Sequence, residues 1–223
     1  MNIRSPIAAT LLALTWACAS PSPEAPEPAP VPPVPAGSAA EATEAEGTAE
    51  PRMSVSERAH WFARLGWPAA CERAFAVTRS GDDGGLAIHD LAEGGAIALV
   101  RCAPGAYQPT SVVMVFDHER PEATARLLTL PYYRSPYGRE LVRARTTEIT
   151  GELRWLADQQ SLVLLALSRQ TADCGIWTRY SLAGGKPRIT RLAARLPCPE
   201  GAELPVDASG GEPPIGWRPV RAD

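Results

Sequence analysis

The chain has 223 residues, with 25 acidic and 22 basic side chains and a formal net charge of −3 at pH 7. Its arginines are scattered, which excludes the clustered basic surface typical of nucleic-acid binding, and we expect no nucleic-acid partner. The composition is that of a globular protein, and residues 53–223 are long enough to form one domain with a sizeable core.

The first 17 residues predict a secretory signal peptide. Arg4 supplies a positive charge, and the run from Pro6 to Ala17 has no charged residue and is rich in Ala and Leu. A basic start, a short apolar run and small residues at its end are typical of such a leader. The run is shorter than the roughly 20 apolar residues that a membrane-spanning helix needs.

Cys18 follows at the point where the leader would be cleaved. The stretch resembles a bacterial lipobox, in which this cysteine is lipidated and becomes the mature N-terminus, although Thr15 replaces the usual Leu and Leu14 lies one residue further back. Because Ala19 rather than Asp follows, the resemblance implies an anchor in the outer membrane facing the periplasm. The alternative is ordinary cleavage, which would leave a soluble secreted or periplasmic protein.

Residues 18–52 predict a linker. Eight prolines between Pro21 and Pro35 alternate with Ala, Glu and Val, which favours an extended polyproline conformation. Residues 36–50 contain Ala, Gly, Ser, Thr and Glu with almost no large apolar side chain, so they cannot bury enough surface to fold. We therefore expect a Pro/Ala/Glu-rich disordered tether between the lipid and the domain of residues 53–223.

The domain opens with a predicted helix over residues 54–65. Ser54 and Glu57 have the spacing of a capping box, apolar residues recur at helical spacing, and Gly66 ends the pattern. A second short helical turn is predicted over residues 69–74.

The remainder predicts short strands. The apolar runs GLAIHDL and AIALVRC are joined by AEGG, which predicts a hairpin, and SVVMVFD is typical of a central buried strand. Further candidate strands are RLLTL, RTTEITGELRWL, SLVLLALS, CGIWTRYSL and RITRLAARL, whereas PYYRSPYGRE is predicted to be a turn-rich loop. The fold class is therefore mainly β, antiparallel and either sandwich-like or α+β, with one short N-terminal helix.

Four cysteines lie in this domain, Cys71, Cys102, Cys174 and Cys198. An even number in an exported chain predicts disulfides. Of the three connectivities that four cysteines allow, we favour Cys71–Cys102 with Cys174–Cys198, because each pair flanks one local group of strands. The alternative is that one pair stays reduced.

One block of the domain resembles a known bacterial family. VRCAPGAYQPTSVVMVFD places Cys102 shortly before Gly105, Ala106 and Tyr107 and then a second strand. Later matching positions are Gly151 to Leu153, Asp173, Cys174, Gly175, Trp177, Tyr180, Cys198 and Trp217. The pattern, over roughly Gly66 to Val220, is similar to the uncharacterised envelope family catalogued as domain of unknown function 1176. The resemblance implies secretion and disulfides but no activity, and the family's Gly-rich basic run before Asp-Cys-Gly is replaced here by SRQTADCG.

The sequence offers no recognisable catalytic set. His60, His89 and His118 lack metal-binding spacing, and no GxSxG elbow occurs, so we expect no catalytic residue, no metal and no cofactor. Asp173 is either a general acid or, as we favour, a turn residue that caps backbone N–H groups. The GDDGG stretch at 81–85 is either a weak calcium loop or, as we favour, a solvated turn.

The candidate binding residues are aromatic and basic: Tyr107, Tyr132, Tyr133, Arg134, Tyr137 and Arg139. Tyrosine and arginine are enriched at binding hot spots, although we favour the alternative that the tyrosines close the end of the sheet. Two functions stay open. The favoured one is a non-enzymatic envelope lipoprotein that binds an envelope protein or a glycan, and the alternative is a periplasmic hydrolase whose site the sequence does not reveal.

Overall fold

A computed structural model of the chain describes residues 53–136, 138–170, 173–201 and 211–222. The predicted signal peptide, the lipidation site at Cys18, the linker and Tyr137 lie outside the described residues. None of the helices in the described part has the length and hydropathy of a membrane span.

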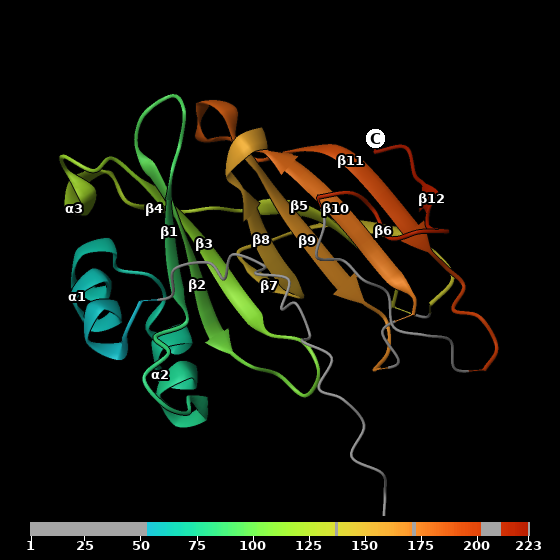
Figure 1. Cartoon of the computed structure of the whole chain (residues 1–223), viewed down its shortest axis with the longest axis horizontal. Coiled ribbons are helices and arrows are strands. Elements are labelled where there is room, and N and C mark those ends of the chain that lie inside the picture. Colours follow the sequence, from blue (N-terminus) through green and yellow to red (C-terminus); the bar gives the residue numbers. More distant parts are fainter. Residues whose placement is uncertain (1–52, 137, 171–172, 202–210, 223) are drawn as a thin grey trace, which may run out of the picture. The chain divides into compact units, whose positions relative to one another are not determined.

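Figure 1 shows that strands dominate the described residues, as predicted. In chain order the elements are α1 (Val55–Leu65), α2 (Ala69–Thr78), β1 (Leu86–Asp90), β2 (Ala96–Ala103), β3 (Thr110–Phe116), α3 (Pro121–Thr124), β4 (Arg126–Leu127), β5 (Leu130–Arg134), β6 (Val142–Thr146), β7 (Glu148–Thr150), β8 (Glu152–Leu156), the 3₁₀ turn η1 (Ala157–Gln159), β9 (Ser161–Leu167), β10 (Gly175–Ser181), the 3₁₀ turn η2 (Ala183–Gly185), β11 (Arg188–Arg195) and β12 (Arg218–Pro219). All the strand pairs are antiparallel, so the predicted fold class is confirmed.

The first sheet has the strand order β1-β2-β3-β4, and β7 also pairs with β3. Both of its faces are covered, because alternate side chains of β2 and β3 enter different cores. The side chains that point toward the second sheet are Ile97, Leu99, Val113 and Val115. Those that point toward the helices are Ala98, Val100, Val112 and Met114. This two-sided burial is the reason that the predicted central strand has so few polar residues.

The two helices cover the outer face of the first sheet (Figure 1). The capping box of α1 is confirmed, with the side chains of Ser54 and Glu57 each accepting from the other's backbone N–H, and Gly66 ends the helix in the left-handed conformation. The predicted second turn is a full helix, α2. The first disulfide, Cys71–Cys102, joins α2 to β2.

The second sheet has the order β12-β11-β10-β9-β8. Its inner face contributes Leu162, Leu164 and Tyr180 to the core that it shares with the first sheet. The second disulfide, Cys174–Cys198, joins the residues that flank β10 and β11 at their adjacent ends. The favoured connectivity is therefore confirmed.

Two predicted strands are interrupted where the chain changes its pairing partner. RTTEITGELRWL is divided at Gly151, so that β7 pairs with β3 and β8 pairs with β9. Gly151 has φ 143°, and a Cβ there would lie 2.6 Å from the carbonyl oxygen of Leu165, so this crossing point requires glycine. RLLTL is likewise divided between β4 and β5.

The prediction that PYYRSPYGRE is a loop is partly wrong, because its first four residues belong to β5. β5 pairs with β6 in a two-stranded ribbon. Tyr133 packs with Ile176 and Leu192 of the second sheet, which holds the ribbon against that sheet. The sequence did not predict this strand because its prolines and turn residues are typical of a loop. The strand is buried by partners more than 40 residues away in the chain.

Candidate functional site

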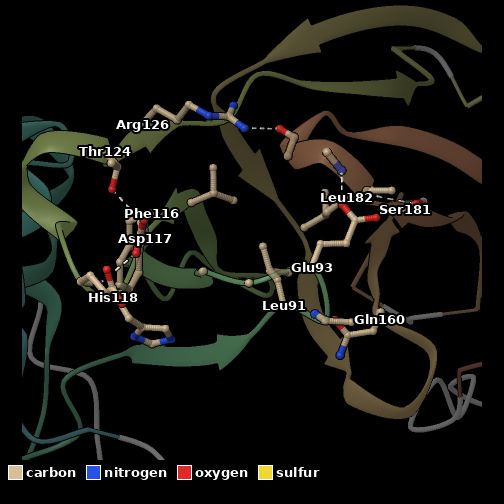
Figure 2. A pocket seen from close by; sticks show the side chains of 18 of the residues that line it. Leu91, Glu93, Phe116, Asp117, His118, Thr124, Arg126, Gln160, Ser181 and Leu182 are labelled. Carbon is tan, nitrogen blue, oxygen red and sulfur yellow. Dashed lines mark hydrogen bonds between the residues drawn. The ribbon is translucent and has the colours of Figure 1, made fainter.

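A cleft of about 900 Å³ opens where turns of both sheets meet. Figure 2 shows it between the end of β3 with the α3 segment on one side and the turns of the second sheet on the other. Its lining comes from residues 91–95, 115–119, 159–160 and 181–185, with Thr124 and Arg126. These segments are turns and strand ends, which are the places where sheets carry recognition residues.

Hydrogen bonds between the turns shape one wall of the cleft. The backbone N–H of Ala92 donates to Oε1 of Gln160 at 2.7 Å, and that of Gly184 donates to Oε2 of Glu93 at 2.9 Å. The guanidinium of Arg126 donates to the carbonyl oxygen of Gly185 across the cleft (Figure 2). The β1–β2 turn is therefore fastened to both turns of the second sheet.

The opposite wall follows β3. Nε2 of His118 lies 2.8 Å from Oδ1 of Asp90, and the imidazole packs edge-on against Phe116. The backbone N–H of Asp117 donates to Oγ1 of Thr124 at 2.9 Å, which orients the segment before α3. Among the described residues, no serine, threonine or cysteine is hydrogen-bonded to His118, so the histidine has an acid partner but no nucleophile.

The charged groups of the cleft are mainly acidic. Glu93, Asp117 and Glu119 contribute carboxylates, while Arg126 contributes a guanidinium that is already hydrogen-bonded. Leu91, Val115 and Leu182 add apolar surface among them. This combination favours a ligand with hydroxyl or amino groups over an anion, because unmatched like charges repel.

The pKa shifts fall outside the cleft. Hydrogen bonds from Ser54 lower the pKa of Glu57 in the capping box, and a hydrogen bond from Arg191 lowers the pKa of Glu212. Burial raises the pKa of the Tyr180 hydroxyl far above its ordinary value. Each shift reflects a structural contact, and none identifies a proton-transfer group.

The predicted binding residues are not brought together at this cleft. Tyr132, Tyr133 and Arg134 lie on β5, whereas Tyr107 lies half-exposed in the β2–β3 loop. Tyr133 is buried, Tyr132 is half-buried, and Arg134 and Arg139 are exposed. None of these five lines the cleft.

The two acidic candidates are both engaged by arginines. The fully buried Asp173 accepts from Nε of Arg169 at 2.8 Å. In the GDDGG stretch, Oδ2 of Asp83 lies 2.8 Å from Arg101, and its Oδ1 accepts from the N–H of Gly85 at 2.8 Å. No group of three or more His, Cys, Asp and Glu side chains within the described ranges is arranged to hold a metal ion.

The sequence does not predict that the cleft residues come together. Glu93, His118 and Gln160 come from three different turns. Their local patterns predict a hairpin at AEGG and no metal site at His118. Turn signals close to polar residues were visible in each segment, but nothing local indicates that the turns meet. No protein-family model, curated protein or solved structure matches the chain.

Proposed function

We propose that the protein is a lipoprotein of the bacterial cell envelope that binds a ligand in the cleft without transforming it. The cleft is the observation that carries the proposal, because its volume of about 900 Å³ is in the range of ligand-binding pockets. Two disulfides support an oxidising compartment. The proposal includes anchoring through Cys18 and membership of the family known as domain of unknown function 1176.

The ligand that the cleft favours is a neutral or amino-bearing glycan of the envelope. Sugar hydroxyls and free amino groups can donate to the carboxylates of Glu93, Asp117 and Glu119, and the apolar side chains can pack against the sugar rings. An anionic ligand would meet these carboxylates, and Arg126 is the one arginine or lysine among the described residues that line the cleft.

A hydrolase remains the second candidate because of one observation, the pairing of His118 with Asp90 at 2.8 Å. This pair resembles the base and orienting group of a catalytic triad. Against it, both side chains are largely exposed, at 49% for His118 and 89% for Asp90, and no nucleophile contacts the histidine among the described residues.

The anchor is tested by the intact mass of the mature protein, purified from the membrane fraction without reductant. We expect a chain that starts at Cys18, carries acyl groups and lacks the four hydrogens of two dithiols. A mature N-terminus elsewhere without acyl groups would remove the lipoprotein assignment.

Ligand binding is tested with soluble chitosan oligosaccharides, which carry hydroxyl and free amino groups and no carboxylate, added to the mature protein and followed by heteronuclear NMR. We expect shift changes confined to residues 91–95, 115–119, 159–160 and 181–185. Ala92→Trp, which fills the cleft from an exposed position, should weaken binding at least tenfold, whereas Ala63→Trp on the exposed side of α1 should not.

The two candidate functions predict different fates for the probe. Oligosaccharides recovered unchanged after prolonged incubation support a binding module. Cleaved products that disappear with His118→Ala would support the hydrolase, and shift changes absent at millimolar probe would overturn the choice of a glycan ligand.

A further inference from the structure

The β5–β6 ribbon presents a strand edge. β6 pairs with β5 and with no other described strand. Figure 1 shows the ribbon running across the second sheet. The side chains of Tyr133 on β5 and Leu141 just before β6 pack into the core formed with β10 and β11. The domain therefore holds the ribbon, while no described strand pairs with the outer edge of β6.

Four arginines without a carboxylate partner lie on the ribbon strands and the segment that connects them. Arg134, Arg139, Arg143 and Arg145 are all exposed, and none of them forms an ion pair within the described ranges. The only carboxylate in residues 130–146 is Glu140, so the ribbon carries an excess of positive charge.

Several arginines elsewhere in the domain are compensated by a carboxylate. Arg58 pairs with Glu72, Arg101 pairs with Asp83, and Arg179 pairs with Glu212. The ribbon therefore differs from these sites in that its countercharge does not come from the described part of the chain.

The spacing of the arginines matches the geometry of an added strand. Arg143 and Arg145 are two residues apart on β6, so they project from the same face, while Val142, which is 40% exposed, projects from the other. A chain that pairs with this edge would place alternate side chains beside the two guanidinium groups. A second copy of β6 is disfavoured there, because like charges on paired strands repel.

We propose that the β6 edge is a docking site for an extended acidic segment of a partner protein, which adds as a third strand and sets alternate carboxylates against Arg143 and Arg145. The backbone ladder supplies affinity, as in other cases of strand addition, and charge-assisted hydrogen bonds select the acidic side chains. This surface is separate from the cleft, so its test does not depend on the proposed ligand.

The test uses the full mature protein and a labelled synthetic peptide of four Glu-Thr repeats, acetylated and amidated at its ends, with binding followed by fluorescence anisotropy. We expect saturable binding that the double variant Arg143→Glu, Arg145→Glu weakens at least tenfold. The matched control reverses two exposed, unpaired arginines at α2, Arg73→Glu and Arg79→Glu, and should leave binding unchanged. Equal losses in the two double variants would overturn the site.

Backbone pairing is tested with two further peptides, one N-methylated on every glutamate and one on every threonine. Because only alternate N–H groups face the ribbon, one of the two should lose binding at least tenfold and the other should keep it. Equal binding by both would overturn strand addition. Binding to phosphatidylglycerol vesicles that needs the same arginines and exceeds binding to the peptide would replace the acidic protein segment with an anionic membrane surface.

Discussion

The outer faces of the two sheets are covered in different ways. Helices α1 and α2, which lie within the chain and carry a disulfide to β2, cover the first sheet. The segment of residues 211–222 covers the second sheet, and it is joined to that sheet by the two-residue strand β12. The difference suggests that the first cover unfolds with the core, whereas the second can open locally at lower free energy.

A buried arginine organises the first cover. Arg58 is 1% exposed, its Nε donates to Oε2 of Glu72 at 2.9 Å, and its Nη1 donates to the carbonyl oxygens of Gly84 and Arg101. The guanidinium also lies 3.8 Å from the ring centroid of Phe75. One side chain thus ties α1 to α2, to β2 and to the loop before β1.

The second cover combines one aromatic anchor with exposed charges. Trp217 is 6% exposed and packs with Trp177 and Ala193 on the outer face of the sheet. Glu212 forms ion pairs with Arg179 and Arg191, but its own side chain is 67% exposed. Such pairs are screened by water and salt, so the tryptophan should contribute most of the attachment.

The largest expected effect is that of Arg58→Ala. It removes the guanidinium from the Glu72 carboxylate, which keeps the indole N–H of Trp67 as a donor, and it takes the same donor from the carbonyl oxygens of Gly84 and Arg101. Breaking a buried ion pair in this way costs about 3–5 kcal/mol. Urea unfolding measures the change. Arg73→Ala, at an exposed position of α2, is the control and should change the free energy of unfolding by less than about 0.5 kcal/mol. A loss below about 1 kcal/mol in Arg58→Ala would show that the helices are held without this network.

Trp217→Ala should have the next largest effect, about 3 kcal/mol, because it removes a large buried side chain. Hydrogen exchange should speed up first in residues 211–222 and only later in β9 and β10. Ile215→Ala is the matched control two residues away, since Ile215 is fully exposed and should give almost no change. Uniformly faster exchange through both sheets would contradict the idea of a locally opening cover.

Glu212→Gln should have the smallest effect, and it should depend on pH. The hydrogen bond from Arg191, with a smaller contribution from Arg179, lowers the pKa of Glu212 in the folded protein. The carboxylate therefore stabilises the folded protein fully at pH values above the pKa that Glu212 has in the unfolded chain. This stabilisation is lost as the pH falls through the lowered pKa of Glu212 in the folded protein.

This effect is measured as the protection of residues 211–222 against hydrogen exchange at neutral and acid pH, corrected for intrinsic rates. The neutral-pH difference between wild type and Glu212→Gln should vanish in acid. Glu148→Gln, which removes an exposed carboxylate that has no ion pair in the described part of the chain, should show no such difference. If the difference in protection between wild type and Glu212→Gln persists below the pKa of Glu212 in the folded protein, the charge of Glu212 is not the cause of the protection.

The candidate site was not predictable from local patterns. The turn that contains Glu93 could be identified as a hairpin, but its hydrogen bond to Gly184 joins positions 91 residues apart. The same holds for β5, whose prolines and tyrosines are typical of a loop. Its burial is evident only from the packing of Tyr133 against Ile176 and Leu192 in the structure. In each case the deciding contact involves residues that are distant in the sequence.

The sequence by itself determined the features that depend on near neighbours. These are the capping box at Ser54, the hairpin around AEGG, the two-sided burial of β3 and the pairing of cysteines within each strand group. Helix caps, side-chain alternation and short loops act over a few residues to a few tens of residues, so they leave a local pattern. Only the tertiary structure decided the crossing at Gly151, the cleft and the charged ribbon edge, because strand pairing brings together segments that no local pattern relates.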